Sequence, residues 1–487
     1  KFNASKDISI ASAATLKDHR YEAATTSVID EEQGNQQTNK QGALAIVVAT
    51  SGSSDAAASE ITIADNTAIE SVDGKLELSS TVLIEQNRRD HLIEEIEARW
   101  KQLTGYFVET DLKPKLAEFE DQKNKMVTAF KAVTSGQNST DNFKQLLSAM
   151  VEFGKLVVDT FGVAGSAVSP VIAGAKETAF SILDIVNPAG WANMYVSAAG
   201  TSKDSKHSSL SVSGAIGVLN QSSSNTLKIG TKTSLVSGGN LSITADSKNG
   251  NVALTGYLDN LIGIPLPTRD NSQAFGASLG YQQLESNNAL TISEGADIEA
   301  EHGSLTLTAS DQLKAIAVTA SAGLNSGGTS FSGMVAVTKA DGSNTLAIDD
   351  EATLDSVGAM TIDARRDDLL ETIAGALGKT SSDEGGSVAV GAGIAVNLGG
   401  VDNKLEIKDN DSASSTINYG AGHLVSSAGT LTLTADTTVN ANAIGVAGEA
   451  ATTTHKDLGE QLDNLPGEEV DGDAFSADEI ENMTEVA

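Results

Sequence analysis

The sequence contains no cysteine, which excludes disulfide bonds and thiolate metal sites. Aromatic residues make up only 4% of the chain, so we do not expect a thick globular core filled by large rings. The sequence also has no run of about 18 uncharged apolar residues, so it predicts no transmembrane helix. Small residues are abundant instead, and they suit thin, closely stacked layers.

Basic residues are scarce as well. The chain has 32 Lys and Arg against 65 Asp and Glu, a formal net charge of −33. This surface would repel phosphate groups, which argues against a nucleic-acid partner. Two interpretations of the excess acid stay open: solubility for a long β surface, which we favour, and diffuse binding of Ca²⁺ by surface carboxylates. We assign no cofactor.

A repeat is the strongest feature that the chain does have. A Leu-x-Ile triplet recurs at steps of 63, 56 and 59 residues, with copies that begin at Leu227, Leu290, Leu346 and Leu405. Each triplet precedes a Leu-Thr-Leu-Thr-Ala segment or a close variant, which begins at Leu241, Leu305, Met360 and Leu431. An Ile-x-Ile copy begins at Ile61. So steady a period predicts units that stack on one another.

Within each repeat, apolar residues alternate with polar or small ones, and Gly or Asn separates the runs. This pattern predicts strands with no helices between them. A tandem array of sandwiches would need about 100 residues per domain and larger core residues. We therefore favour a mainly β fold, a parallel β-solenoid of about 60-residue repeats. Since a solenoid coil usually takes roughly 20–30 residues, we expect two or three coils per repeat.

Residues 85–200 follow a different pattern. Residues 112–133 carry apolar side chains at heptad spacing, interrupted only by Lys123. Both tryptophans, Trp100 and Trp191, and seven of the eleven phenylalanines lie in this block, as expected of a compact helical core. The 166 residues from Ile61 to Leu227 equal one period plus a long insertion. The sequence thus predicts a helical bundle inserted into the repeat array.

Four regions follow from these patterns. Residues 1–84 and 201–455 are predicted as β-solenoid repeats, residues 85–200 as the α-helical insertion, and residues 456–487 as an acidic tail or linker. Both ends of the chain look cut from a longer repeat array, so we expect a segment of a larger protein.

The recurrent Gly-x-Leu-x-Leu-x-Ala, followed by an Ala-rich strand, resembles the repeats of large secreted bacterial β-helical exoproteins. These are the filamentous-haemagglutinin-like and leukotoxin-type filamentous adhesins. The resemblance covers residues 1–84 and 201–450 and rests on repeat style. It implies a right-handed parallel β-helix at the bacterial cell surface or outside the cell, serving in adhesion or as a fibrous spacer. The family's amino-terminal secretion domain is not recognisable, so the export route stays open.

The strongest candidate for chemistry is the charged stretch at residues 363–368. Its ionisable members are Asp363, Arg365, Arg366, Asp367 and Asp368. Carboxylates two residues apart on a strand share a face, which could serve acid–base catalysis or a metal. The other copies of this position are ordinary polar residues, however. We interpret the stretch as a solvated turn.

No other motif carries a site. The six histidines are scattered, and the sequence has no nucleophile elbow or phosphate-binding loop. Glu469, Asp471 and Asp473 are spaced like the start of an EF-hand loop, but Ala474 stands where Gly is required. We therefore assign no catalytic, cofactor-binding or metal residues.

The leading hypothesis is a non-enzymatic structural or adhesive surface protein, a rod with a helical projection. Its partners would be surface molecules of a host or neighbouring cell, or other copies of itself, bound through many weak contacts. Two alternatives remain: a carbohydrate-active β-helix enzyme, such as a polysaccharide lyase or hydrolase, and a self-assembling extracellular fibre subunit.

Overall fold

The computed structural model describes most of the chain outside its connecting segments and C-terminal tail. The residues described are 1–17, 21–29, 41–51, 55–85, 89–108, 113–134, 139–161, 170–186, 192–202, 209–256, 273–325, 329–381, 388–408, 416–417 and 430–452. This part is mainly β, and every strand pair in its three sheets is parallel, as the sequence predicts.

Each coil consists of a long strand in sheet C, a short strand in sheet A and a long strand in sheet B. One complete coil contains β12 (Gln273–Ile292), β13 (Asp297–Ala300) and β14 (Leu305–Asn325). The next coil repeats the same path with β15 (Thr329–Ile348), β16 (Thr353–Ser356) and β17 (Met360–Ser381).

The remaining strands extend the same three sheets. Sheet A also contains β1 (Phe2–Ala4), β6 (Ala68–Ser71), β10 (Ser234–Ser237) and β19 (Thr416–Ile417). Sheet B adds β2 (Ile8–Lys17), β3 (Tyr21–Ile29), β7 (Leu76–Glu85), β8 (Met194–Ser202), β11 (Leu241–Gly256) and β20 (Leu431–Thr452). Sheet C adds β4 (Gln41–Thr50), β5 (Asp55–Ile63), β9 (Ser209–Ile229) and β18 (Val388–Ile407).

The prediction of two or three coils per repeat is wrong. Leu290 pairs with Leu227 on one side and with Leu346 on the other, so one sequence repeat is one coil. The reason is the length of the strands. The small-residue segment and the Leu-x-Ile triplet, which the sequence suggests are separate strands, form one continuous strand of 20 residues in β12.

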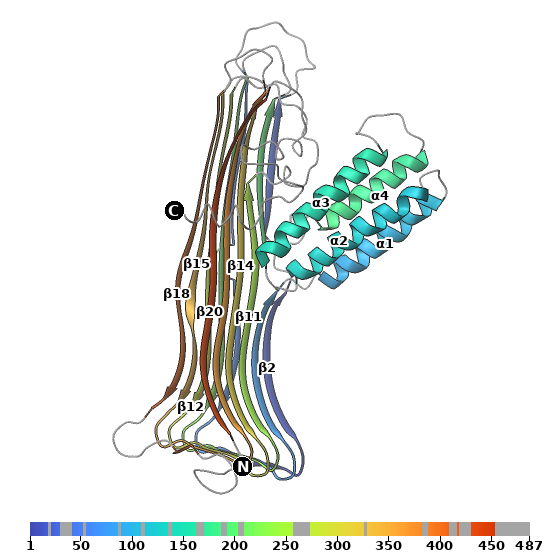
Figure 1. The fold of residues 1–487 in the computed structure, drawn as a ribbon. Helices are drawn as coiled ribbons and strands as arrows, with labels where there is room; N and C mark the ends of the chain where they lie inside the picture. Colours follow the sequence, from blue (N-terminus) through green and yellow to red (C-terminus); the bar gives the residue numbers. More distant parts are fainter. Residues whose placement is uncertain are drawn as a thin grey trace.

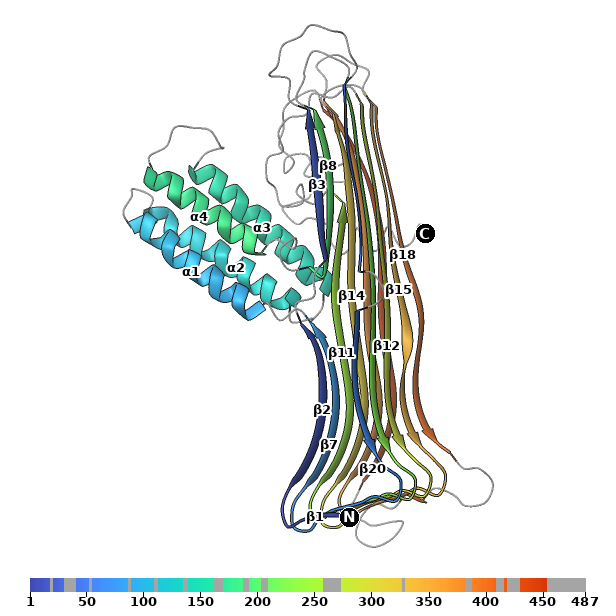
Figure 2. The ribbon, with the colours of Figure 1, turned by 180° about the vertical axis from the view of Figure 1, so that it is seen from behind.

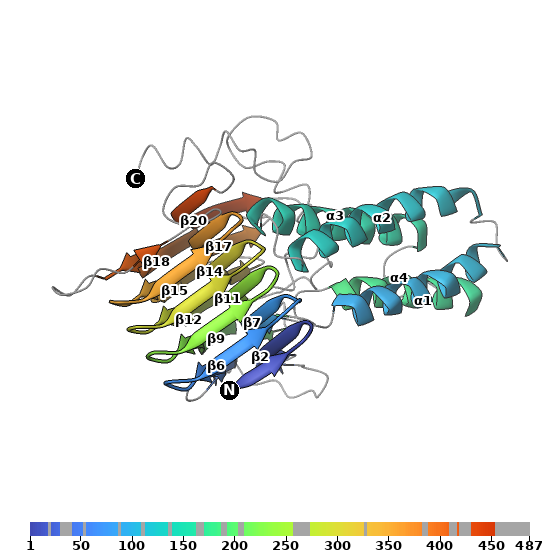
Figure 3. The same ribbon diagram turned by 90° about the horizontal axis from the view of Figure 1, so that it is seen from below.

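Sheets B and C run side by side along the length of the molecule, and sheet A joins them at one end (Figure 1). The view from behind shows the same two long sheets (Figure 2), and the view from below shows the coils stacked in order from β2 to β20 (Figure 3). Between the sheets, the Leu and Ile of the repeat motifs stack on their equivalents. Leu227, Leu290 and Leu346 are fully buried in this core.

The helices lie between β7 and β8. They are α1 (Arg89–Val108), a 3₁₀ turn (Lys113–Lys115), α2 (Leu116–Thr134), α3 (Ser139–Phe161) and α4 (Pro170–Val186). Strand β11 pairs with both flanking strands, through Asn249 with Ile84 and through Ala253 with Met194. Residues 85–193 therefore stand where the neighbouring strand has only the three residues 250–252.

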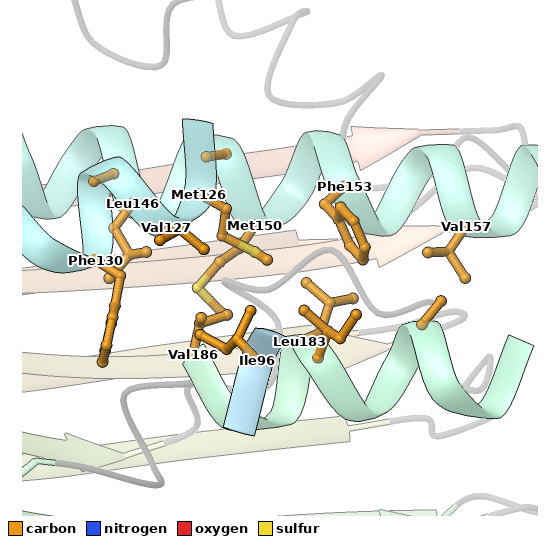
Figure 4. Packing of buried hydrophobic residues seen from close by; sticks show 14 of the residues in the cluster. Ile96, Met126, Val127, Phe130, Leu146, Met150, Phe153, Val157, Leu183 and Val186 are labelled. Atoms are coloured by element: carbon orange, nitrogen blue, oxygen red, sulfur yellow. The ribbon is translucent and has the colours of Figure 1, made fainter. Parts of the chain in front are cut away.

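The helical core contains the aromatic residues that the β coils lack. Phe107, Phe119 and Phe153 are fully buried, and the rings of Phe107 and Phe119 lie 5.0 Å apart. Met126, Met150 and Leu183 pack in the same cluster (Figure 4). This aromatic packing gives the bundle a core of its own.

Lys123, the residue that interrupts the heptad, is buried with a partner from another helix. Its Nζ lies 3.1 Å from Oε1 of Glu97 and 5.1 Å from the centre of the Trp100 ring. An ion pair and a cation–π contact thus replace the apolar contact that the heptad predicts at this position.

Candidate functional site: the apolar outer face of sheet C

The outer face of sheet C carries rows of apolar side chains that cross the strands. Along each strand, buried residues alternate with residues that point outward, and the parallel register aligns the outward ones from coil to coil. Four such rows are apolar in every coil apart from Thr50 and the Tyr281 hydroxyl. We call this surface the apolar face.

The four rows follow in order along the strands. The first ridge contains Val212, Phe275, Phe331 and Val390. The small row contains Ile46, Gly214, Ala277, Gly333 and Ala392. The second ridge contains Val48, Ile216, Leu279, Val335 and Ile394, and the fourth row contains Thr50, Val218, Tyr281, Val337 and Val396.

The residues of these rows are exposed or half-buried. Val48 is 61% exposed and Ile394 is 57% exposed, at opposite edges of the face. In the first ridge, the rings of Phe275 and Phe331 stack with their centres 5.3 Å apart, and each ring remains 39% exposed. A stacked aromatic pair holds a rigid apolar surface without needing a cover from the rest of the described chain.

From Gly214 to Ala392 the small row forms a shallow groove between the two ridges, because its side chains there are no larger than a methyl group. At β4 the groove ends at Ile46, whose side chain is 59% exposed. A Cβ atom added to Gly333 would meet nothing within 4 Å, and one added to Gly214 would meet its first neighbour only at 3.6 Å. The groove follows the stacking direction of the coils, because each row crosses the strands through paired residues.

The outer face of sheet B also carries apolar side chains, but there the helical bundle covers them. On the outer face of sheet B, Leu254, Ile316 and Val318 pack against the helical bundle and are nearly fully buried. No described helix covers the apolar face of sheet C, and a contiguous exposed apolar area marks an interaction surface.

The charged stretch at residues 363–368 is not a solvated turn, so that interpretation is wrong. It lies in the interior of β17, and its residues alternate between the two faces of the strand. Asp363, Arg365 and Asp367 point outward, whereas Arg366 and Asp368 point between the sheets. The strand continues because Arg366 finds a partner in the neighbouring coil and also bonds Asp368 of its own strand.

That partner is Asp311 of β14. The Arg366 Nη1 atom lies 3.0 Å from Oδ2 of Asp311, and Arg366 Nε donates to Oδ2 of Asp368 at 2.9 Å. Ser286 Oγ, from sheet C, donates to Oδ1 of Asp311 at 2.7 Å. At the position equivalent to Ser286 in the next coil stands Gly342, with φ +138°, where a Cβ would lie 1.9 Å from the Ser286 carbonyl oxygen.

Burial dominates the electrostatics of this cluster. Loss of hydration raises the pKa of Asp368 to about 6, although the nearby Arg366 acts in the opposite direction. Burial likewise raises the pKa of Asp311. Two carboxylates share one guanidinium, so one retained proton leaves the cluster neutral. All three side chains are closed to solvent, so no substrate reaches them, and we assign the cluster a structural role.

Sequence analysis missed an asparagine ladder inside the coils. Nδ2 of Asn225 donates to Oδ1 of Asn288, Asn288 to Asn344, and Asn344 to Asn403, at 2.8–2.9 Å. Each also donates to backbone carbonyls of sheet B across the interior, as Asn288 does to Ala245 and Ser310. The signal is present in the sequence, since each asparagine stands two residues before a Leu-x-Ile triplet.

The remaining candidate sites concern the described part of the chain. It holds no group of three or more His, Asp or Glu side chains placed to bind a metal ion. None of its helices is both long and apolar enough to cross a membrane. Glu469, Asp471 and Asp473 lie outside the described residues.

Comparison with known proteins gives no match to this chain among family models, curated proteins or solved structures.

Proposed function

We propose that this chain is a rod-like segment of a secreted bacterial exoprotein, a right-handed parallel β-helix with a structural or adhesive role at the cell surface. The observation that carries the proposal is the one-to-one register of the coils. From β9 to β18, every strand of sheet C pairs residue for residue with the next over its described length. Such stacking gives reach and rigidity without requiring a catalytic centre.

The interior of the coils supports the same reading. The asparagine ladder and the Leu and Ile stacks repeat from coil to coil, so the long dimension of the stack is held by equivalent contacts. Polar groups of any one coil are paired mainly by its neighbours. A scaffold of this kind presents its outer surface to partners, while its repeated interior contacts serve stability.

Two features differ from the repeated interior of the coils, and binding specificity would lie in them. The helical bundle projects from the side of sheet B (Figure 1), and the apolar face occupies the outside of sheet C. In the adhesive role, both would be displayed repeatedly on a cell surface, and weak contacts would add through multivalency.

Surface display is the part of the proposal that an experiment tests most simply. Antibodies raised against the purified chain are applied to intact and to lysed cells of the producing bacterium, with a cytoplasmic protein as the control. We expect label on intact cells and in the culture medium. Label that appears only after lysis would contradict an extracellular role.

Adhesion is tested separately with the purified chain. If the chain is adhesive, it should compete with intact bacteria for attachment to host or neighbouring cells, whereas the chain without residues 85–193 should compete less. Surface display without any competition would leave a structural spacer as the role.

A further inference from the structure

We infer that the apolar face binds the same face of a second copy of this chain, forming a two-fold symmetric dimer with sheet C packed on sheet C. The proposal goes beyond surface display and adhesion, because it concerns association of the isolated chain in solution. It rests on the size, the shape and the charge of the apolar face.

The size of the apolar face meets what a stable dimer needs. With strands about 4.8 Å apart and same-face residues about 6.6 Å apart, five strands and four rows cover roughly 600 Å². Two copies would bury roughly 1,200 Å² in total, which reaches the range of specific interfaces even before the relief of the side chains is counted.

The shape of the face is complementary to itself. The small row, with Gly214, Ala277 and Gly333, lies between two ridges whose side chains extend beyond it. A two-fold axis that lies between the two sheets, parallel to the rows, places the second ridge of each copy over the small row of the other. Because both copies have the same strand spacing, the ridge side chains meet the groove with the same period along its length.

The charge of the face also favours a second copy. A chain with net charge −33 resists self-association wherever its carboxylates face one another. None of the four rows carries an ionisable side chain apart from Tyr281. The charged residues begin beyond the fourth row, where Lys339 and Asp341 pair with each other on β15. The apolar face is therefore a place where two copies can meet without repulsion between carboxylates.

The helical bundle leaves this face accessible. The helices extend from sheet B, and sheet C lies on the opposite side of the coils (Figure 3). A dimer formed through sheet C would thus carry two bundles that point away from each other, which doubles the number of projections on one double rod.

Sedimentation velocity on the full chain tests this inference. The variant Gly333→Lys places a charge in the groove, where an added Cβ meets open space. The matched control is Gly375→Lys on β17 of sheet B, where an added Cβ also meets nothing within 4 Å. We expect a dimer for wild type and for Gly375→Lys. For Gly333→Lys, we expect the dissociation constant of the dimer to be at least 100-fold larger. The circular dichroism spectra of all three should be the same.

A cross-link identifies the surface that is used. The chain has no cysteine, so Ala277→Cys introduces a single thiol in the groove and Thr361→Cys a single thiol on the outer face of sheet B. A short bismaleimide should cross-link two copies of Ala277→Cys and should leave two copies of Thr361→Cys without a covalent link.

Three results would overturn the proposal. One is a wild-type chain that stays monomeric at 100 μM, and another is a dimer that Gly333→Lys does not weaken. The third is a monomer that binds zwitterionic phosphatidylcholine vesicles through this face, since that would assign the apolar face to a lipid surface. None of these results bears on surface display, which the antibody experiment tests by itself.

Discussion

Asn288 donates a hydrogen bond through Nδ2 to Oδ1 of Asn344, 2.8 Å away in the next coil. The two residues hold the same place in successive coils. Asn288 also accepts a hydrogen bond at Oδ1 from Asn225 in the preceding coil, and its two Nδ2 hydrogens are shared among Asn344 and two carbonyls of sheet B. One buried side chain therefore connects three coils and both long sheets.

Replacing Asn288 with Ala should destabilise the whole stack. The substitution leaves the amide of Asn225 and the carbonyls of Ala245 and Ser310 without this partner inside the core. Orphaned buried polar groups cost about 1–3 kcal/mol each, and relaxation around the smaller side chain recovers part of this. We expect the free energy of unfolding in urea to fall by about 2–4 kcal/mol. Thr291→Ala, an outward position on the same strand, should change it by less than about 0.5 kcal/mol. Equal effects of the two substitutions would show that the ladder does not bear on stability.

The charge cluster predicts an unusual dependence of stability on pH. The native pKa of Asp368 is raised to about 6, above its ordinary value of 3.8, so the folded state holds this proton more tightly than the unfolded state does. The stability that the proton contributes is complete below about pH 4 and is lost as the pH rises through about 6. The difference between the two pKa values corresponds to on the order of 3 kcal/mol.

Asp368→Asn removes this titration and keeps a neutral side chain of the same size. We expect the wild type to lose stability between pH 4 and pH 6.5 relative to Asp368→Asn, as measured by urea unfolding at each pH. Asp367→Asn, which changes an outward carboxylate on the same strand, should retain the wild-type slope. If Asp368→Asn kept that slope as well, the proton would have to reside elsewhere.

The insertion should be removable without loss of the coils. Since residues 85–193 stand beside only Gly250, Asn251 and Val252 of β11, we expect Gly-Asn-Val to replace them and to let β7 continue into β8. Circular dichroism should lose its helical component and keep its β component, with cooperative unfolding. Loss of the β signal would mean that the bundle is required for the coils to fold.

The same variant should expose an apolar surface that the bundle covers in the full chain. Removing the bundle exposes Tyr195, Leu254, Ile316 and Val318 on the outer face of sheet B. We expect stronger binding of a hydrophobic dye than in the full chain, and a combined Ile316→Thr and Val318→Thr substitution should reverse it. An unchanged dye signal would show that the helices do not cover this surface.

Much of the architecture could be predicted from the sequence, because the repeats place identical apolar residues on identical neighbours. Leu227, Leu290, Leu346 and Leu405 mark the coils, and the helical stretch was recognisable from its heptad spacing and its aromatic residues. The size of one coil was not predictable in this way. Alternation of apolar and polar residues marks a strand but not its length, and β12 passes without a break through residues that appear to divide it.

The interior polar groups escaped prediction for a related reason. Arg366 and Asp368 lie two residues apart, as any two inward-pointing neighbours on a β-strand do. Burial of this charged pair is stabilised by Asp311, which stands 55 positions earlier in the chain and forms an ion pair with Arg366 because the two strands are in register. The apolar face was hidden similarly, because its rows run across strands that are far apart in the sequence. Phe275 and Phe331 become neighbours only when the coils stack.

The central claim is that each repeat forms one coil in register with the next, since both the rod and its outer surfaces depend on it. The most direct measurement is disulfide formation in a chain without other cysteines, with Thr306→Cys and Thr361→Cys placed opposite each other on the outer face of sheet B. Paired positions on parallel neighbours lie about 5 Å apart, within reach of a disulfide bond. The account predicts rapid oxidation within one chain for this pair and none for Thr306→Cys with Thr329→Cys. A disulfide in the second pair, which a coil of roughly 20–30 residues would bring together, would contradict it.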